Sequence, residues 1–270
     1  MRRAVTRAPL APLFSIVTVT YNCAQAISGT IASIQGQSFH DYEHVVKDGG
    51  STDGTLEEMR RLGVTYLVSE PDAGIYDAMN RALGMCRGQY VHFLNAGDAF
   101  ASPNVLQRVA EAIQQQPHVP FWYGDVLTMQ PHRVYGAGQA GQGRLLRYPE
   151  RFTRLLSYLL SVCHQSWFVA RSLYERYPFD LSFHLKADHD FFLHWILEAG
   201  IEHRHVALPV VIYAAGGESE RRRALLRREH HRLLKRYYSL PERIGYWLIQ
   251  KGWQTYRVGR FYLRGEAPPV

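Results

Sequence analysis

Short apolar segments alternate with segments of helical periodicity over the first 116 residues, and this alternation restricts the possible folds more than any other feature of the chain. Residues 13–20 are apolar and β-branched, as expected of a strand buried in a parallel sheet. Isoleucines then recur at helical spacing between residues 27 and 34, and residues 44–46 form a second short strand. Because repeated strand–helix–strand units build a doubly wound sheet, we predict an α/β unit over residues 13–116.

Polar residues follow three of the predicted strands. Tyr21 and Asn22 end the first strand, and Asp48 ends the second. Asp98 follows a strand predicted over residues 90–94. In doubly wound sheets, ligands bind in a crevice beyond the carboxyl ends of the strands. The sequence therefore predicts one ligand-binding crevice that contains these four side chains.

The second half of the chain is less regular. Residues 121–125 indicate a strand and turn, and Asp188 opens a helix whose apolar side chains lie on one face. Residues 136–141 match the Gly-X-Gly-X-X-Gly pattern of dinucleotide-binding loops. No strand precedes this pattern, and no acidic residue follows about 20 positions later, as dinucleotide binding requires. This context excludes a nicotinamide cofactor.

Composition limits the class of protein. Hydrophobic residues make up 46% of the chain and charged residues 20%, which is ordinary for a folded globular protein. Cys23, Cys86 and Cys163 lie far apart without metal-ligand spacing, which argues against a disulfide framework or a zinc site and favours a cytoplasmic location. No segment reaches the roughly 18 apolar residues of a membrane span. Residues 1–12 are predicted to be a flexible tail without the apolar core of a signal peptide.

Two carboxylates are suited to metal binding or to acid–base chemistry. Asp98 lies in a turn directly after a strand, where a carboxylate can bind Mg²⁺ or Mn²⁺ together with a diphosphate. Aspartate in a turn also commonly accepts a hydrogen bond from its own backbone. Asp188 lies at the mouth of a helix, where it can act as a general base or as an ordinary N-cap. Spacing alone leaves both alternatives open for each residue.

Two further residues are assigned to the acceptor or phosphate side of the same site. Asp190 is the second carboxylate of the segment over residues 186–190. His164 can contact an acceptor or a leaving phosphate, although a histidine among apolar neighbours is also common in a protein core.

In these segments the chain resembles the inverting nucleotide-sugar glycosyltransferases of family 2, which have the GT-A fold. The matching segments are Phe14–Asn22, Asp48–Thr55, Gly74–Asn80, Gly88–Asp98 and Ala187–Phe192. The resemblance is greatest to members that build bacterial exopolysaccharide, capsule or lipopolysaccharide side chains. It implies a mainly parallel, doubly wound GT-A domain over residues 13–217. In that domain, residues 13–116 bind the nucleotide sugar and residues 117–217 supply the acceptor site and the catalytic base.

The resemblance also implies a role for each matching residue. Thr20, Tyr21 and Asn22 match residues that pack around the nucleotide base and ribose. Asp48 is implied on the nucleoside side, and Asn80 is implied in the donor pocket. Asp98 matches the last carboxylate of the metal-binding Asp-X-Asp element, and Asp188 matches the catalytic base.

Two positions depart from the family pattern. Many relatives have a second aspartate, used to read the base, where this chain has Gly49. The first part of the metal-binding element is Ala96-Gly97, without a carboxylate. Metal binding then depends mainly on Asp98 and the donor phosphates. Asp72 or Asp77 is available to compensate for a missing carboxylate, unless both are simply solvated surface groups.

The resemblance fades after residue 217, and residues 218–270 form a basic, aromatic-rich extension that we predict to be helical. Eight Arg or Lys residues lie between Ser219 and Tyr238, against two Glu residues. Basic residues interleaved with aromatic ones suit a helix that lies on an anionic lipid surface, whereas a helix packed on the domain with a solvated charged face is equally compatible. A basic chain can also bind nucleic acid, but no recognition motif supports it.

Together these features predict an inverting glycosyltransferase that moves a sugar from a nucleotide diphosphate donor to a hydroxyl of a glycan or lipid-linked saccharide. The expected location is the cytoplasm, including the inner face of the bacterial membrane. Two alternatives remain open from the sequence: a catalytically idle relative that binds nucleotide or glycan, and another nucleotide-sugar enzyme such as a nucleotidyltransferase.

Overall fold

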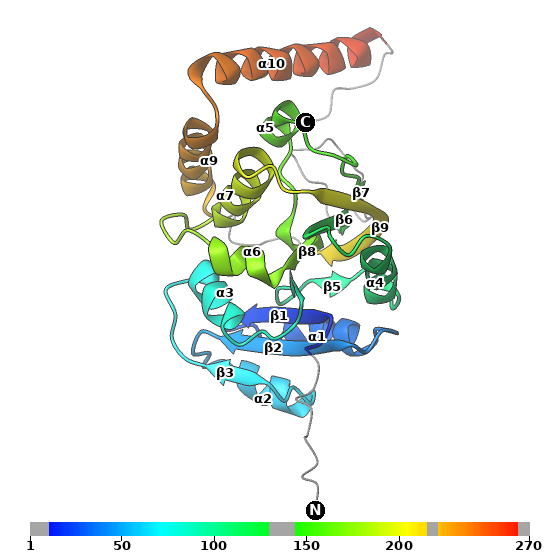
Figure 1. Cartoon of the computed structure of the whole chain (residues 1–270). Helices are drawn as coiled ribbons and strands as arrows, with labels where there is room; N and C mark the ends of the chain where they lie inside the picture. Colours follow the sequence, from blue (N-terminus) through cyan, green and yellow to red (C-terminus); the bar gives the residue numbers. More distant parts are fainter. Residues whose placement is uncertain (1–10, 130–143, 215–220, 264–270) are drawn as a thin grey trace, which may run out of the picture.

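The computed structural model describes residues 11–129, 144–214 and 221–263, with side chains as far as residue 252 (Figure 1). The glycine-rich segment over residues 136–143 and nearly all of the predicted N-terminal tail lie outside the described residues.

The first half forms the predicted parallel sheet. Its strands are β1 (Phe14–Thr20), β2 (Tyr42–Asp48), β3 (Leu67–Ser69) and β4 (Tyr90–Phe93), in the spatial order β3-β2-β1-β4. All neighbouring pairs within this group are parallel. The connecting helices are α1 (Ile27–Gln35), α2 (Thr55–Arg61) and α3 (Ile75–Leu83). β1 and β4, in the middle of the sheet, are buried along their whole length, as the continuous apolar segments predict, whereas the edge strand β3 is partly exposed.

The second half extends the same sheet with strands of mixed direction. These strands are β5 (Ala99–Phe100), β6 (Phe121–Thr128), β7 (Arg144–Leu146), β8 (Trp167–Ala170) and β9 (His203–Tyr213). The order continues β4-β8-β6-β9-β5, and β7 pairs with β6. β8 is antiparallel to both β4 and β6, whereas β6 and β9 are parallel. The α/β fold is therefore confirmed, but the sheet is mainly parallel only in its first half.

Helices cover both faces of the sheet. The second half adds α4 (Val105–Gln115), α5 (Arg154–Leu159), the 3₁₀ turn η1 (His164–Ser166), α6 (Arg171–Arg176), α7 (Ala187–Leu193) and the π-helical segment η2 (His194–Glu198). In β1, Val17 and Val19 pack in a core with α3, α6 and α7. Phe14 and Ile16 point to the opposite face and pack with α4. This alternation along one strand separates the two cores.

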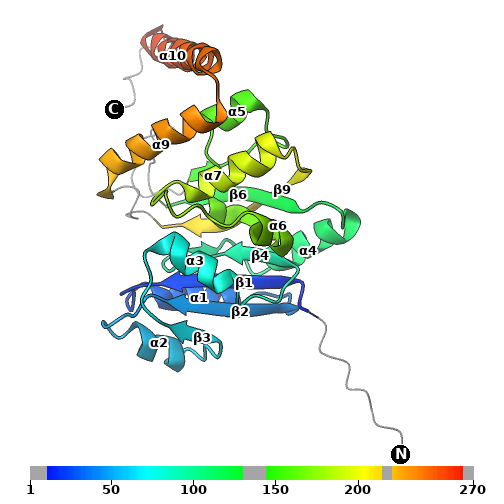
Figure 2. The same ribbon diagram turned by 60° about the vertical axis from the view of Figure 1, so that its left-hand side comes forward.

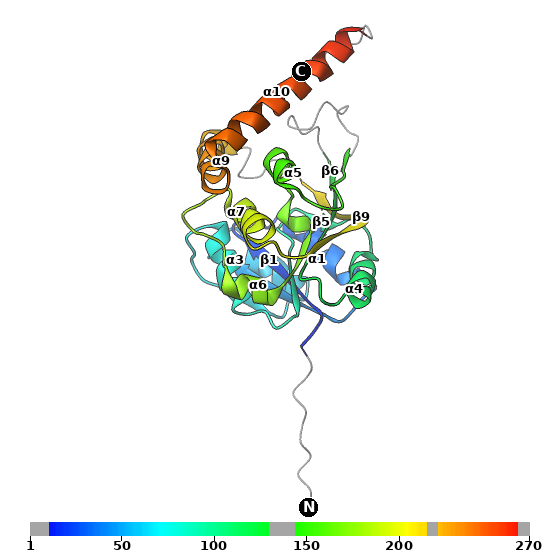
Figure 3. The ribbon, with the colours of Figure 1, turned by 45° about the horizontal axis from the view of Figure 1, so that its top comes forward.

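The C-terminal part of the described chain consists of two helices, α9 (Arg223–Tyr237) and α10 (Leu240–Leu263), so the predicted helical extension is confirmed. Leu233 and Tyr237 of α9 are buried in the same core as α7. Figures 1 and 2 show that α10 lies beyond α5 and α9, at the edge of the molecule opposite β3, and Figure 3 shows α10 extending away from α9.

Gly88 marks a close approach between the start of β4 and β1. A Cβ atom at this position would lie 2.4 Å from the backbone nitrogen of Ser15 and 2.6 Å from the carbonyl carbon of Phe14. The Gly88 N–H also donates to Ser15 Oγ at 2.9 Å. Because backbone atoms cannot move aside as a flexible side chain can, only glycine fits here.

Gly88→Ala is therefore expected to destabilise the fold by about 2–4 kcal/mol, through forced separation of β4 from β1. Gly29→Ala is the matched control, because no atom lies within 4 Å of the added Cβ. Gly29 lies within α1, where alanine stabilises a helix by up to about 1 kcal/mol relative to glycine. Urea unfolding of both variants measures the difference. Equal stability of the two variants would contradict this account of the β1–β4 contact.

Candidate active site

The turn after β4 is held in place by Thr30 of α1. Thr30 is buried, and its hydroxyl donates to the carbonyl oxygen of Asp98 at 2.7 Å. The same hydroxyl accepts a hydrogen bond from the Gly97 N–H at 3.0 Å. Gly97 has a φ of +96°, which glycine adopts without steric cost. These contacts fix the backbone from which the Asp98 side chain extends.

The Asp98 carboxylate is bound by distant parts of the chain. The Ala214 N–H donates to Oδ1 at 2.7 Å, and the side-chain amide of Gln165 donates to Oδ2. Only 4% of the residue is exposed. Burial raises the pKa of Asp98 to about 7, although the Ala214 hydrogen bond and the nearby His164 act in the opposite direction. The carboxylate therefore does not serve as a local cap of its own turn.

His164 lies in η1, the 3₁₀ turn that precedes β8. The carbonyl oxygen of Cys163 accepts hydrogen bonds from both the backbone nitrogen and the hydroxyl of Ser166, which closes the turn. Nδ1 of His164 lies 3.1 Å from Oδ2 of Asp188, and Nε2 lies 3.3 Å from Nδ2 of Asn95. His164 is therefore not a histidine enclosed by apolar groups, because both ring nitrogens have polar partners.

Asp188 lies in the first turn of α7, and the N-cap position belongs to Lys186. Its Oδ1 accepts hydrogen bonds from the Tyr76 hydroxyl at 2.9 Å and from the His189 N–H at 2.8 Å. The side chain is 18% exposed. Burial favours a raised pKa, but the hydrogen bond from His164, with Lys186 and His189, outweighs it and holds the pKa of Asp188 well below its usual value.

The turn η1 brings the two carboxylates together. His164 contacts Asp188, and the next residue, Gln165, contacts Asp98. We call Asn95, Asp98, His164, Gln165, Tyr76 and Asp188 the polar cluster. The cluster joins residues from the carboxyl end of β4, from α3, from η1 and from α7, so it unites the two halves of the domain.

Three residues assigned to the donor form a separate, connected loop region at the ends of β1 and β2. The Thr20 hydroxyl donates to Oδ1 of Asp48 at 2.9 Å. The Asn22 side chain accepts from the Thr52 N–H at 2.9 Å, which ties the two strand ends together. Tyr21, between these two residues in the chain, is 67% exposed, so its ring is accessible to a ligand.

Asp48 itself is fully buried and accepts hydrogen bonds from its own loop and from the ends of β1 and β3. Oδ2 accepts from the backbone of Gly50 and Ser51 and from the Ser69 hydroxyl, and Oδ1 accepts from Thr20 and Ser51. Burial alone would raise the pKa of Asp48, but these hydrogen bonds lower it. Asp48 therefore stabilises the loop, and its carboxylate is not exposed for contact with a nucleotide base.

Gly49 lies between Asp72 and Tyr21. A Cβ atom at Gly49 would lie 2.6 Å from Oδ2 of Asp72 and 3.3 Å from Cδ2 of Tyr21. The Asp72 carboxylate therefore occupies the space into which a side chain at position 49 would extend. Asp77, the other acidic residue considered, instead accepts from Ala73 N–H and pairs with Arg81.

Asn80 and Asp190 form hydrogen bonds outside the polar cluster. Both amide atoms of Asn80 bind the backbone of Phe179, at 2.9 and 3.0 Å. Asp190 is fully buried and accepts from the hydroxyls of Tyr177 and Tyr237, each at 3.0 Å. These contacts join α7 to α9 and to the preceding segment, and the structure does not bring either residue into the polar cluster.

The described residues offer a small set of oxygen donors for a divalent cation. No group of three His, Cys, Asp or Glu side chains suited to a metal occurs within the described part of the chain. Each Asp98 oxygen accepts one hydrogen bond and retains a lone pair. The nearby Asn95 Oδ1 is buried without a hydrogen-bond partner. This donor set fits Mg²⁺ or Mn²⁺ bound mostly by substrate phosphates and water, as such ions commonly are.

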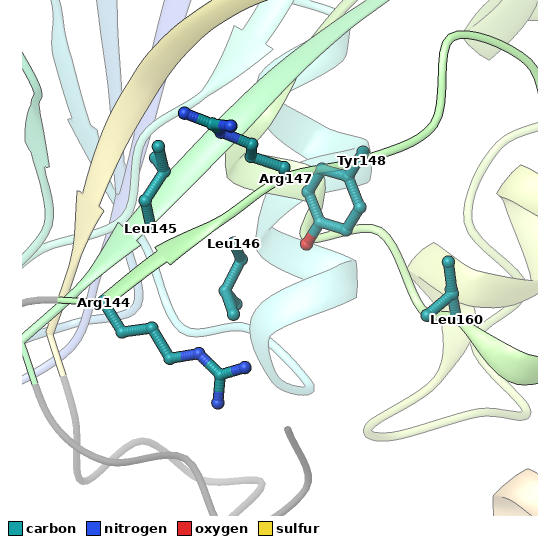
Figure 4. Close-up of a pocket in the computed structure, with 6 residues that line it drawn as sticks. All are labelled: Arg144, Leu145, Leu146, Arg147, Tyr148 and Leu160. Carbon is teal, nitrogen blue, oxygen red and sulfur yellow. The ribbon is translucent and has the colours of Figure 1, made fainter. Parts of the chain in front are cut away.

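A cavity of about 140 Å³ opens beside β7. Figure 4 shows Arg144, Leu146 and Tyr148 projecting to one side of the strand, with Leu160 across from them. Tyr148 connects the cavity to the polar cluster, because its hydroxyl accepts a hydrogen bond from the backbone of Cys163, the residue before His164.

Four members of this arrangement escaped the sequence analysis: Thr30, Tyr76, Asn95 and Gln165. Gln165 adjoins His164, and Tyr76 lies within the Gly74–Asn80 segment, so both stood next to residues that the sequence did indicate. Thr30 carries no such signal, because a threonine within a helix has no distinctive pattern.

Known proteins resemble this chain in sequence and in structure. The model of Glycosyl transferase family 2 matches residues 15–177. A Mycobacterium tuberculosis protein named PGL/p-HBAD biosynthesis glycosyltransferase is 32% identical over 209 residues, which are 75% of this chain and 77% of the relative.

Two solved structures, both glycosyltransferases, share the fold. Glucosyl-3-phosphoglycerate synthase of M. tuberculosis, in complex with Mn²⁺, UDP and glucosyl-3-phosphoglycerate, has a TM-score of 0.62 at 18% identity, over 84% of this chain and 80% of that one. S. aureus TarS 1–349 in complex with UDP-GlcNAc has a TM-score of 0.58 at 21% identity, over 76% and 59%. The GT-A fold is thus confirmed, and the chain belongs to glycosyl transferase family 2 as a glycosyltransferase.

Proposed function

We propose that this glycosyltransferase moves a sugar from a nucleotide diphosphate donor to a hydroxyl of a bacterial glycan or lipid-linked saccharide, with inversion at the anomeric carbon. The observation that carries the proposal is the contact of consecutive residues, His164 and Gln165, with Asp188 and Asp98. An acceptor-side base and a donor-side carboxylate are thereby kept within one site. The alternative of a nucleotidyltransferase is set aside, because the matching family is one of glycosyl transferases.

Asp188 is the general base of the proposal. Its lowered pKa keeps the carboxylate ionised at neutral pH, so it can accept a proton from the acceptor hydroxyl. Inversion follows if that hydroxyl attacks the anomeric carbon from the side opposite the departing diphosphate. The displacement then needs no covalent intermediate with the protein.

Asp98, with Asn95 Oδ1, is the proposed place for Mg²⁺ or Mn²⁺. A bound cation would neutralise charge on the leaving diphosphate. The donor base and ribose are proposed to lie against the exposed ring of Tyr21, close to Thr20 and Asn22. Asp72 supplies the carboxylate beside that ring in place of a side chain at Gly49.

The acceptor is proposed to approach from the opposite side, along the cavity lined by Leu146, Tyr148 and Leu160. The backbone N–H of Cys163 donates to Tyr148 of this cavity, and the next residue, His164, contacts Asp188, which supports the assignment of His164 to the acceptor side. The direct contacts of Asn80 and Asp190 with the protein support structural roles instead.

Asp188→Asn is expected to lower turnover by about 100-fold to 10,000-fold, since an amide cannot accept the proton. A thermal-shift screen of UDP-, GDP- and dTDP-sugars first identifies the donor, and transfer or donor hydrolysis is then measured. Asp41→Asn, an exposed aspartate near the start of β2, is the matched control and should keep its activity. Equal rates for wild type and Asp188→Asn would remove Asp188 from catalysis, and retention of anomeric configuration in the product would exclude inversion.

Asp98→Asn is expected to change metal binding and pH dependence together. Because the folded-state pKa of about 7 exceeds the ordinary value of 3.8, the wild type loses stability as the pH rises between these two values. Asp98→Asn lacks this loss. Without metal, its free energy of unfolding should therefore exceed that of the wild type by up to about 4 kcal/mol above pH 7 and by little near pH 4. The variant should also lose the extra stabilisation that Mn²⁺ gives to wild type with nucleotide.

Thermal unfolding across this pH range, with and without Mn²⁺ and nucleotide, measures both effects. Glu57→Gln on α2 is the control, since it changes a solvent-exposed carboxylate. Persistence of the Mn²⁺ effect in Asp98→Asn would rule out Asp98 as a ligand.

The C-terminal helices support a location at an anionic membrane surface on the cytoplasmic side. Leu240, Ile244, Trp247 and Leu248 recur along one side of α10 and are between 50% and 60% exposed. The other side holds the helix to the domain, through Tyr246 against Tyr158 and Tyr238 and through the ion pair of Glu242 with Arg154.

Charge adds to this apolar side. Residues 221–252 contain ten Lys or Arg and two Glu, which favours anionic lipid headgroups. No helix in the described part of the chain is long and apolar enough to cross a membrane. An apolar stripe on a basic helix suits contact with the lipid interface.

Leu248→Glu is expected to reduce flotation with phosphatidylglycerol vesicles several-fold, because it places a charge within the apolar stripe. Gln250→Glu adds the same charge at an exposed position of α10 outside the stripe and is the control. If both variants float equally well, this side of α10 does not contact the membrane.

A further inference from the structure

The Asp188 carboxylate is held unequally at its two oxygens. Oδ1 accepts two hydrogen bonds, from the Tyr76 hydroxyl at 2.9 Å and from the His189 N–H at 2.8 Å. Among the residues that the structure describes, Oδ2 has one partner, Nδ1 of His164 at 3.1 Å. Since a carboxylate oxygen has two lone pairs, Oδ1 is fully used and Oδ2 keeps one lone pair for a further donor.

Asn95 determines which nitrogen of His164 carries a proton. Nε2 of His164 lies 3.3 Å from Nδ2 of Asn95, and an amide nitrogen can only donate. With the Asn95 amide in this orientation, Nε2 accepts, so the neutral ring carries its proton on Nδ1 and donates it to Asp188. The ring of His164 also lies edge-on to Trp167, with a centroid distance of 6.2 Å, so packing limits its rotation.

These contacts reach Asp188 from elements that are distant in the chain. Tyr76 comes from α3, His164 from η1, and Asn95 from the turn that carries Asp98. Tyr76 is 6% exposed, and the side chain of His164 is 12% exposed, so solvent competes little for their hydrogen bonds. Buried donors with defined partners hold an acceptor in one orientation.

We propose that Tyr76, Asn95 and His164 are positioning residues that orient Asp188, so that the free lone pair of Oδ2 faces the acceptor hydroxyl. The proposal rests on the proposed function of Asp188 as the base. It assigns the proton-accepting atom and the residues that keep this atom in place, and it gives His164 no direct part in proton transfer.

The assigned step balances as a direct displacement. The acceptor O–H bond breaks and its proton goes to Oδ2 of Asp188. The acceptor oxygen forms a bond to the anomeric carbon, and the bond from that carbon to the phosphate oxygen breaks, with its electron pair on the diphosphate. His164 keeps its proton on Nδ1 and Tyr76 keeps its hydroxyl proton throughout.

Removal of a positioning donor should change the titration of Asp188, because each donor stabilises the ionised carboxylate. The groups that face this carboxylate are Tyr76 and Tyr174 from α3 and α6, Cys163 and His164 at η1, and Lys186 and His189 at α7. Burial favours a raised pKa, and His164, Lys186 and His189 favour a lowered one. Loss of His164 therefore raises the pKa of Asp188. Loss of the Tyr76 hydroxyl acts in the same direction, because it removes a hydrogen bond to the ionised carboxylate.

The test is a pH titration of the full chain labelled with ¹³C at the aspartate carboxyl carbons. The Asp188 signal is assigned by its absence in Asp188→Asn. In the wild type it should stay ionised to the lowest pH at which the protein is folded. His164→Ala and Tyr76→Phe should each raise its midpoint by about one pH unit or more. His164→Asn keeps an N–H donor near the position of Nδ1 and should restore part of the shift.

Tyr42→Phe is the matched control, since it removes a tyrosine hydrogen bond to a backbone carbonyl far from Asp188. An Asp188 midpoint that is the same in His164→Ala, Tyr76→Phe and Tyr42→Phe would overturn the proposal. If His164→Ala does not fold, Tyr76→Phe and His164→Asn still give a decisive midpoint. Two-bond ¹H–¹⁵N correlation spectra of the histidines provide a second readout. They should show His164 protonated at Nδ1 in the wild type and a different tautomer in Asn95→Leu.

These measurements need no substrate. A negative titration result would therefore contradict the positioning proposal without contradicting the proposed function. Full turnover by Asp188→Asn would remove the base and leave the titration result standing. Where turnover is measurable, the positioning variants should lower kcat about 10-fold to 100-fold more than they raise KM for the acceptor, because a misdirected base acts on the chemical step.

Discussion

The active-site arrangement depends on the short turn η1, because two consecutive side chains of that turn contact two carboxylates from different halves of the domain. His164 contacts Asp188 and Gln165 contacts Asp98. The turn is itself closed by Ser166 onto the carbonyl of Cys163 and is followed directly by the buried strand β8. A displacement of η1 would break both contacts at once. The geometry of the proposed chemistry therefore depends on the position of this turn.

The same physical cause, burial, acts on both carboxylates, yet their pKa values move in opposite directions. Asp98 accepts from a neutral backbone N–H and a neutral amide, and burial dominates. Asp188 faces His164, Lys186 and His189, which stabilise its ionised form more than burial opposes it. Two carboxylates with divergent pKa values can take different tasks at one pH. This electrostatic difference matches a base on the acceptor side and a cation-dependent group on the donor side.

The loop after β2 illustrates how packing replaces a side chain that the family pattern predicts. The Asp48 carboxylate accepts five hydrogen bonds, three from its own loop and one each from Thr20 and Ser69. A side chain at Gly49 has no room because Asp72 fills that space. The carboxylate near Tyr21 thus comes from the segment after β3 instead of from the end of β2. A pattern along one strand cannot reveal this exchange, since the two segments meet only in space.

The sequence by itself determined the α/β alternation, the strand ends that carry Asp48 and Asp98, and the helix that begins near Asp188, because buried strands and amphipathic helices leave periodic apolar patterns. It could not separate residues that stabilise the fold from residues that face a ligand. Asn80 and Asp190 match the predicted site in sequence, but their side chains form hydrogen bonds with Phe179 and Tyr237 within the protein. Tyr76 reaches Asp188 across 112 positions, and Ala214 reaches Asp98 across 116. Such contacts depend on which elements pack together, which includes an antiparallel β8 between β4 and β6. Only the tertiary structure decided the hydrogen-bond partners of each carboxylate, because those partners come from elements that no local pattern connects.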